Sequence, residues 1–347
     1  MNMGALILCD ALWGDSGKGK ISAYLCRKHD AKYCIRAGTG TNAGHSVYEG
    51  NKLFKLRQLP CGFLNDKTVV MVGSGVAVDP QVFLDEVKEY GLRSRAKVDF
   101  RCPIITEEYR LAESRDSSLS EIGSTKSGTG YTLAQFRLRK AKQARDIPEL
   151  KDYLADVAEE ANNACEAGEK VIVECSQGTM LSLALSPDYP YVTSDNCTAI
   201  AAADDAGLNW RAIEDVFMVV KALPTRVGKG PLPYEMSVQE IEKRRLAEYG
   251  VVTGRPRRKA SQIDMRILKY VSMLNAPSKI ALTFCDHYDP DITGANSKTQ
   301  LTPKILKLIR EIEETTRAKV VIAETGKDLN NIIDLSESSD RIPRALV

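Results

Sequence analysis

Two lysines, an aspartate and a serine lie within one short glycine-rich stretch near the start of the chain. Residues 13–20 read WGDSGKGK, and Gly14 to Lys20 has the G-x-x-x-x-G-K spacing of a phosphate-binding loop. The backbone N–H groups and lysines of such a loop bind phosphate oxygens. Ile21 stands where such loops place a magnesium-binding Ser or Thr. We therefore expect Asp15, inside the loop, to bind the metal.

A histidine lies in a second glycine-rich turn, residues 42–45 (NAGH). His45 follows an apolar segment that predicts a strand, whereas His29 lies in a charged cluster. A hydrogen-bonded loop residue is the alternative for His45. We favour a functional histidine, because ligands bind where parallel strands end.

Three further polar segments lie between the predicted strands and helices. Residues 123–130 (GSTKSGTG) indicate a second phosphate site, with a flexible linker as the alternative. Gln177 follows an apolar strand, and its amide suits the edge of a purine base. Residues 253–259 (TGRPRRK) are typical of a solvated or polyanion-binding patch, but their arginines can also clamp a small dicarboxylate.

The composition argues against several classes of partner. The 347 residues carry a net charge of only +2, which gives no reason to expect nucleic acid or an anionic membrane. No apolar run approaches the roughly 20 residues of a membrane span. The nine cysteines form no C-x-x-C pair, and the first strand begins too early for a signal peptide. We expect a cytoplasmic protein with reduced, buried thiols.

Strands alternate with helices along the chain, which predicts an α/β fold with a mostly parallel central sheet covered by helices on both faces. The phosphate loop would follow the first strand. We expect one domain, 1–347, with inserted helical and loop subregions. Predicted strands are 5–9, 32–36, 69–72, 98–105, 171–173, 216–220, 280–284 and 320–323, with a hairpin over 46–56. Predicted helices begin at 21 and at 80 and cover 137–142 and 147–167.

Taken together, these segments resemble the adenylosuccinate synthetase family. The length of the chain and segments such as 57–60 (RQLP) resemble its short archaeal-type members. The resemblance spans nearly the whole chain and rests on segments in the family's order: 13–20, 42–45, 177–178, 189–194 (YPYVTS), 225–228 (TRVG) and 253–255. It implies a ligase that joins L-aspartate to C6 of a purine nucleotide through a 6-phosphoryl intermediate, using Mg²⁺ and a nucleoside triphosphate.

The resemblance also implies roles for individual residues. Asp15 would be the base and His45 the acid, with Asp15 and the carbonyl of Gly44 binding Mg²⁺. The triphosphate would contact Ser16, Gly17, Lys18, Gly19, Lys20, Gly44 and Asp286. The purine nucleotide would contact Ser16, Asn42, Ser124, Thr125, Arg139, Gln177 and Thr193. L-aspartate would contact Thr253, Gly254, Arg255 and Arg257. Arg139 would reach the neighbouring site of a homodimer.

The chain departs from the usual family pattern at several positions. Ser16 stands where members usually carry Glu, and 283–286 (TFCD) replaces the T-K-x-D that reads the guanine of GTP. These departures resemble the divergent viral branch that makes 2-aminoadenylosuccinate from dGMP, on the route to diaminopurine DNA of bacteriophages. That branch is associated with ATP and works in the host cytoplasm.

Three hypotheses follow from the sequence. We favour a ligase that acts on dGMP with ATP. The second is an ordinary adenylosuccinate synthetase that uses IMP and GTP, which the retained Asp286 supports. The third is a GTPase-like nucleotide switch, although a switch needs neither Gln177 nor the arginine-rich segment.

Overall fold

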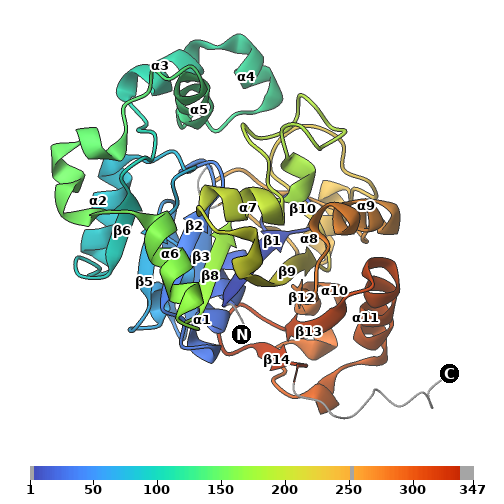
Figure 1. The fold of residues 1–347 in the computed structure, drawn as a ribbon. Coiled ribbons are helices and arrows are strands. Elements are labelled where there is room, and N and C mark those ends of the chain that lie inside the picture. Colours follow the sequence, from blue (N-terminus) through green and yellow to red (C-terminus); the bar gives the residue numbers. More distant parts are fainter. Residues whose placement is uncertain (1–3, 251–253, 337–347) are drawn as a thin grey trace.

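A ten-stranded sheet forms the centre of the molecule in this computed structural model, which describes residues 4–250 and 254–336 (Figure 1). Its strand order is β14-β13-β12-β9-β1-β8-β2-β5-β6-β7, and every pair is parallel except β13 with β14. The strands are β1 (Ala5–Asp10), β2 (Tyr33–Ala37), β5 (Val69–Val72), β6 (Ala96–Asp99), β7 (Leu154–Ala155), β8 (Val171–Cys175), β9 (Ile213–Lys221), β12 (Lys279–Thr283), β13 (Lys319–Glu324) and β14 (Ile332–Asp334). The predicted mostly parallel sheet is confirmed.

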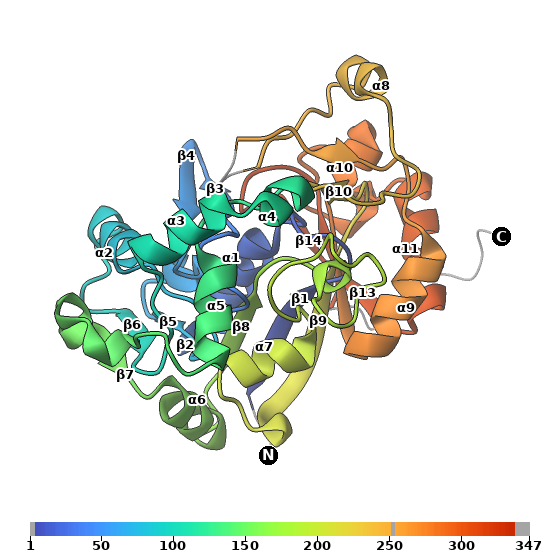
Figure 2. The ribbon, with the colours of Figure 1, turned by 90° about the horizontal axis from the view of Figure 1, so that it is seen from above.

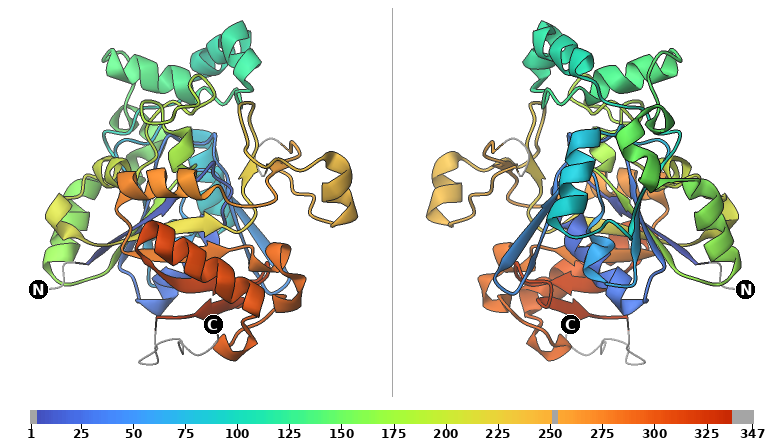
Figure 3. Two further views of the ribbon diagram at one scale, coloured as in Figure 1. Left: turned by 90° about the vertical axis from the view of Figure 1, so that its right-hand side faces the viewer. Right: turned by 90° about the vertical axis from the view of Figure 1, so that its left-hand side faces the viewer.

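Both faces of the sheet are covered by helices, as the two side views show (Figure 3). In β1, Ile7 and Cys9 face one hydrophobic core, and Leu6 and Leu8 face the other. This alternation follows from the two-residue period of a strand that is buried on both sides. The first core is closed by α6 (Val157–Glu166), α7 (Ala199–Asp205), α9 (Met265–Asn275) and α11 (Pro303–Thr316). The second is closed by α1 (Lys18–Lys28) and α2 (Pro80–Glu89).

Inserted segments lie beyond the carboxyl ends of the strands. Three short helices cross in front of the central strands when the molecule is seen from above (Figure 2). They are α3 (Glu107–Arg115), α4 (Ser117–Ile122) and α5 (Thr129–Arg137). Two small antiparallel pairs also border this end of the sheet, β3 (His45–Glu49) with β4 (Lys52–Leu56), and β10 (Thr225–Arg226) with β11 (Arg258–Lys259). The remaining α-helices of the described residues are α8 (Val238–Lys243) and α10 (Cys285–Tyr288).

Three predicted elements differ in the structure. The strand expected over 98–105 ends at Asp99, whose carboxylate accepts the N–H of Arg101 and turns the chain. The helix expected over 147–167 is interrupted by β7, and α6 begins only after Asp156, whose carboxylate caps it. The prediction of a basic helix over 137–142 is wrong. Helix α5 ends at Arg137, and Arg139 has the left-handed φ of 60°.

Two expectations about side chains and helices can be checked directly. All nine cysteines are buried and free of disulfides, as their apolar surroundings predicted. Among residues 4–250 and 254–336, no helix is long and apolar enough to cross a membrane.

Candidate active site

The glycine-rich loop joins the central strand β1 to helix α1. Gly14 and Gly17 have φ values of 85° and 80°, which glycine adopts without steric cost. Gly17 caps α1, so the helix N-terminus and its free N–H groups face the carboxyl end of the sheet. Lys18 is 3% exposed, and its Nζ bonds Asp10 Oδ2 at 3.2 Å and the Gln177 carbonyl at 2.5 Å. The predicted glycine-rich turn between the first strand and its helix is therefore confirmed, and its binding of phosphate stays a prediction.

A cavity of about 1200 Å³ opens beside this loop and brings most of the predicted site residues together. Its lining includes Asp15, Ser16, Gly17, Lys18, Gly19, Lys20, Asn42, Gly44, His45, Ser124, Thr125, Gln177, Thr193, Arg255, Arg257 and Asp286. Gly254 and Arg139 do not line it, and Thr253 lies outside the described residues. The volume exceeds that of a pocket for one small ligand.

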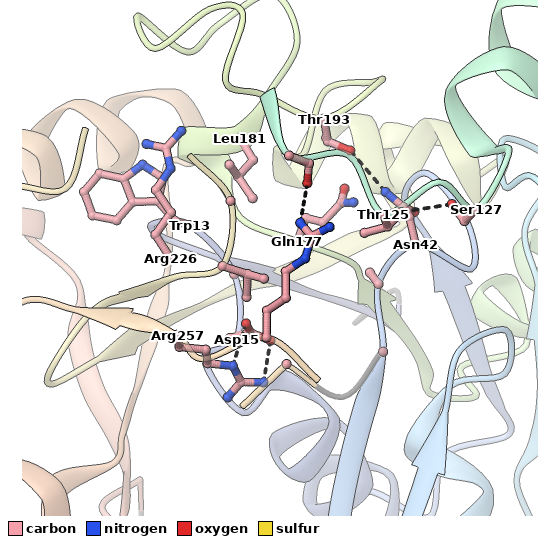
Figure 4. Close-up of a pocket in the computed structure, with 18 of the residues that line it drawn as sticks. Trp13, Asp15, Asn42, Thr125, Ser127, Gln177, Leu181, Thr193, Arg226 and Arg257 are labelled. Carbon is pink, nitrogen blue, oxygen red and sulfur yellow. Dashed lines mark hydrogen bonds and ion pairs between the residues drawn. The ribbon is translucent and has the colours of Figure 1, made fainter. Parts of the chain in front are cut away.

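Four of the residues expected to bind a purine nucleotide, Asn42, Thr125, Gln177 and Thr193, line one part of this cavity (Figure 4). Asn42 Nδ2 lies 3.4 Å from Thr193 Oγ1, and Gln177 Oε1 accepts a bond from Thr39 at 3.1 Å. Thr125 Oγ1 bonds Ser127 Oγ at 3.1 Å. Segments far apart in the chain thus meet here, as their positions at strand ends predicted.

His45 is 8% exposed and lies against two buried charges that the sequence analysis did not assign, Arg36 on β2 and Glu174 on β8. Nδ1 of His45 contacts Glu174 Oε1 and lies 2.5 Å from Arg36 Nη1, while Arg36 and Glu174 are 3.2 Å apart. Glu174 Oε2 also accepts the N–H of Cys61 at 2.9 Å. Arg36 and Glu174 could have been found in the sequence, because each is a charged residue inside an otherwise apolar run, 33–37 and 171–175.

The contacts among His45, Arg36 and Glu174 shift the pKa values of His45 and Glu174. Burial is the main cause that lowers the pKa of His45 to about 4, and Arg36 adds to it, while Glu174 opposes it. Burial alone would raise the pKa of Glu174, but His45 and Arg36 outweigh it and lower the pKa to about 2. Without a bound anion the imidazole is therefore neutral at pH 7.

Stability should fall in mild acid because of His45. Its folded pKa of about 4 lies below the unfolded value of 6.5, so between these pH values the unfolded chain binds more protons. The free energy of unfolding should decrease by about 1.5 kcal/mol between pH 6.5 and pH 5 on this account. Urea unfolding of the native protein and of His45→Gln at both pH values measures it. The partly exposed His29 is present in both proteins and cancels. Equal pH slopes would contradict the prediction.

Cys61 lies beside His45 and Glu174, and their potential ligand atoms are within 4.8 Å of one another. Burial raises the pKa of the Cys61 thiol, and the Arg36 cation already pairs with Glu174. A protonated thiol and a neighbouring cation both disfavour a metal ion. We assign this cluster to the orientation of His45.

The second lysine of the loop, Lys20, is engaged by the protein itself. Its Nζ bonds Glu324 Oε1 at 3.0 Å on β13 and the carbonyls of Gly326 and Asn331 at 2.6 and 3.1 Å. The side chain is 6% exposed. Although Lys20 lines the cavity, these contacts fix its ammonium to Glu324 on β13 and to the segment that follows this strand.

Asp15 contacts an arginine from the segment that was expected to bind a dicarboxylate. Arg257 Nη2 donates to Asp15 Oδ1 at 2.9 Å, and Nε lies 2.9 Å from Oδ2 (Figure 4). Arg257 also donates from Nη1 to Glu248 Oε2 at 2.9 Å. Glu248 is itself held by Lys221 at 2.7 Å and by Lys259, two buried cations. Sequence analysis missed Glu248, which stands nine residues before Arg257.

Three polar atoms of predicted site residues are buried without a hydrogen-bond partner among the described residues. They are Ser16 Oγ, Asp286 Oδ1 and Arg257 Nε, and the last of these faces Asp15 in the ion pair. All three residues line the cavity. Because a buried polar atom without a partner is costly, we expect Ser16 and Asp286 to be positions where a ligand can supply a bond.

Comparison with known proteins identifies the family of this site. The family model described as adenylosuccinate synthetase matches residues 7–149 and 139–290. The chain belongs to the adenylosuccinate synthetase family. The adenylosuccinate synthetases of Methanocaldococcus jannaschii and Archaeoglobus fulgidus are 43% and 44% identical to it, over 95% and 96% of this chain and 96% and 98% of theirs. The resemblance to archaeal members is therefore confirmed, and the protein is a C–N bond-forming ligase that joins aspartate to a purine nucleotide.

Two solved structures share the fold of this synthetase. The fully ligated adenylosuccinate synthetase of Plasmodium falciparum has a TM-score of 0.88 at 24% identity, covering 96% of this chain and all of that one. The succinoaminodeoxyadenylate synthetase of cyanophage S-2L, bound to dGMP and dATP, has a TM-score of 0.80 at 22% identity and covers 96% of both chains. At these identities the structures support the fold alone, so they do not separate the viral branch from ordinary synthetases.

The synthetase also has ligands of the kind that Mg²⁺ prefers. Mg²⁺ binds oxygen ligands and keeps several waters. The Asp15 carboxylate is partly exposed and lines the cavity beside the phosphate loop, and Gly44 also lines it. This donor set fits the ion, which the Asp15 carboxylate and the Gly44 carbonyl would hold, as the sequence analysis expects.

Proposed function

We propose that this synthetase acts on dGMP with ATP. The reaction would be dGMP + ATP + L-aspartate to 2-amino-2′-deoxyadenylosuccinate, or N6-succino-2-amino-dAMP, with ADP and phosphate as the other products. The alternative within the same family is IMP as the acceptor and GTP as the donor. Both acceptors carry N1–H and C6=O, so the same residues can perform either reaction.

The buried hydroxyl of Ser16 carries the choice of acceptor. Ser16 is 2% exposed, and its Oγ has no partner within the described part of the chain. Guanine has a C2 amino group that can donate to this oxygen, whereas hypoxanthine has only C2–H. A glutamate here would bring a larger, charged group into the same space. Satisfying a buried oxygen is worth about 1–3 kcal/mol, or roughly 5- to 150-fold in relative kcat/KM.

The proposed chemistry uses residues whose positions are described above. Asp15 takes the proton from purine N1, so O6 can attack the γ-phosphate. Lys18 and the loop N–H groups hold the triphosphate, and Mg²⁺ when bound neutralises its developing charge. The phosphoryl group brings negative charge beside His45, which raises the imidazole pKa and lets the ring carry a proton. The amine of L-aspartate, held by Arg255 and Arg257, then displaces phosphate from C6.

Two observations favour the alternative substrates. The archaeal relatives at 43–44% identity are named adenylosuccinate synthetase. The unpaired Oδ1 of Asp286 is an acceptor that suits the N1–H and N2–H₂ donors of guanine in GTP. Adenine offers one such donor, its N6 amino group, so this oxygen can also accept a bond from ATP. We therefore keep ATP as the proposed donor and GTP as the alternative.

A product assay separates these readings. The protein is mixed with L-aspartate and Mg²⁺ and with each pairing of ATP or GTP with IMP, GMP or dGMP, and the succinyl product is identified by mass. We expect product from dGMP. Product from IMP and none from dGMP would refute the proposed acceptor. Phosphate release from a triphosphate alone, without L-aspartate or a monophosphate, would instead support a nucleotide switch.

Variants of Ser16 test the determinant itself. Ser16→Ala should lower kcat/KM for dGMP by about 10-fold with little effect on IMP, because it removes one hydrogen bond to the C2 amino group. Ser16→Glu should lose dGMP activity and gain activity with IMP. A Ser16→Glu protein that kept dGMP activity and gained none with IMP would show that Ser16 is not the determinant.

We also propose a homodimer in which Arg139 reaches the neighbouring site. Arg139 is exposed just after α5 and does not line the cavity of its own chain. The adjoining apolar side chain of Leu138 is 58% exposed, and a dimer partner that packs on this surface would bury it. Light scattering of the protein in solution tests the dimer.

A further inference from the structure

Asp15 and Arg257 cannot perform their proposed roles while they are paired with each other. Asp15 needs free carboxylate oxygens to take a proton and to bind Mg²⁺, yet both oxygens lie 2.9 Å from Arg257 nitrogens. Arg257 needs a free guanidinium edge to bind a substrate carboxylate, yet that edge faces Asp15. The pair lies in the cavity, with side-chain exposures of 20% for Asp15 and 10% for Arg257.

The geometry of the pair suits exchange for another carboxylate. Nη2 of Arg257 makes an aligned hydrogen bond to Oδ1, but Nε is not aligned with Oδ2 and has no hydrogen-bond partner among the described residues. The contact is therefore less than the full two-bond fork that a guanidinium forms with a carboxylate. A free carboxylate can approach the guanidinium in the ideal plane, which Asp15, fixed in the loop at φ 54°, does not reach.

A separate anchor keeps Arg257 near the site whichever carboxylate it binds. Its Nη1 bonds Glu248, and its backbone N–H bonds the Glu248 carbonyl at 2.9 Å. Burial raises the pKa of Glu248, whereas the cations Lys221 and Lys259 lower it. The cations outweigh burial and hold this pKa well below the usual range. Glu248 therefore stays ionised, and only the Nε–Nη2 edge of Arg257 is left to change partner.

We propose that Arg257 is a clamp on Asp15 that L-aspartate releases. The α- or β-carboxylate of L-aspartate replaces the Asp15 carboxylate on the Nε–Nη2 edge, and Asp15 becomes free to bind Mg²⁺ and to take the purine proton. This inference rests on the proposed function, and it adds an order to it, because the base becomes competent when the last substrate is present. Arg257 thus couples occupancy of the amino-acid site to activation of the phosphoryl acceptor.

The coupling has a thermodynamic consequence that does not depend on turnover. Arg257 and Mg²⁺ compete for the same carboxylate, so removing Arg257 from Asp15 must strengthen Mg²⁺ binding. By reciprocity, Mg²⁺ must strengthen L-aspartate binding by the same factor. A coupling of about 10-fold is typical for two sites linked in this way.

The test measures Mg²⁺ affinity by tryptophan fluorescence. The chain has two tryptophans, and Trp13 lies two residues from Asp15 with its indole Nε1 on Asp188 at 3.2 Å. Trp210 is 68% exposed and is replaced by phenylalanine, so Trp13 alone reports. Mg²⁺ is titrated into protein saturated with the imido analogue of ATP, and separately of GTP, with and without L-aspartate.

We expect L-aspartate to tighten Mg²⁺ binding to the otherwise native protein by about 10-fold. Arg257→Gln should bind Mg²⁺ about 10-fold more tightly than the native protein when L-aspartate is absent, and it should gain nothing when L-aspartate is added. The control is Arg258→Gln, which removes the adjacent arginine that pairs with Glu235 and makes no contact with Asp15. It should behave like the native protein.

Two results would overturn the clamp. One is Mg²⁺ binding by Arg257→Gln that is no tighter than native, and the other is a native protein whose Mg²⁺ affinity ignores L-aspartate. The second needs no variant, so it stands even where Arg257→Gln folds poorly. Failure of the clamp leaves succinyl product formation intact, whereas failure of the proposed acceptor appears in the product assay and leaves the Mg²⁺–aspartate coupling intact.

Discussion

Replacing Asp15 by asparagine should lower kcat for succinyl product formation by about 10³-fold. The amide cannot accept the purine proton, and general-base catalysis contributes roughly 10²- to 10⁴-fold. The fold should tolerate the change, because Asp15 has a φ of 54° and asparagine adopts this left-handed conformation as readily as aspartate. KM for L-aspartate should stay the same or fall, since Arg257 loses its partner in the loop.

The control for Asp15→Asn is the same substitution at Asp30, which has a φ of 48° and lies just beyond the other end of α1. Asp30 is exposed and pairs with Lys67 at 2.8 Å. Asp30→Asn should leave kcat unchanged. Steady-state rates with saturating substrates measure both variants. A kcat of Asp15→Asn within 10-fold of native would remove Asp15 from the role of base.

The largest effect on stability should come from Glu174→Gln. Glu174 is fully buried and neutralises Arg36, which is 1% exposed, so the variant leaves a buried guanidinium without its counter-charge. Breaking a buried pair by removing one partner costs about 3–5 kcal/mol. We expect the free energy of unfolding in urea at pH 7 to fall by about 3 kcal/mol, since glutamine still accepts a hydrogen bond.

Glu169→Gln is the matched control for this loss. Glu169 pairs with Lys32 at 3.2 Å, but both side chains are more than 40% exposed. Such a surface pair contributes at most about 1 kcal/mol. A Glu174→Gln protein that lost no more stability than Glu169→Gln would mean that water or a rearranged Arg36 solvates the cluster.

Alternation of apolar runs with helices was enough to predict the central sheet, because strands buried on both faces are nearly all apolar. Two of the three segments whose predicted structure was wrong, 98–105 and 147–167, are also apolar or helix-favouring in composition. Their boundaries depend on single carboxylates, Asp99 and Asp156, which bond backbone N–H groups. The antiparallel edge strand β14 was missed, since its three residues are too few to give a periodic pattern.

Residues that line the cavity were predictable where glycine-rich segments follow strands, as for Asp15 and His45. The residues that orient them were not, because their partners are far away in the sequence. Glu174 contacts His45 across 129 residues, and Arg257 contacts Asp15 across 242. Spacing within a segment carries no information on such pairs, and only the folded sheet brings their strands together.

The bond between Lys20 and Glu324 sets the earliest time at which the glycine-rich loop can be completed on the ribosome. The two residues are 304 positions apart, and chains grow at about 5–20 residues per second, so roughly 15 to 60 s separate their synthesis. During that interval Lys20 lacks the carboxylate of Glu324 and the carbonyls of Gly326 and Asn331 that fix it. The nascent chain therefore acquires the finished loop only after these late residues have been translated.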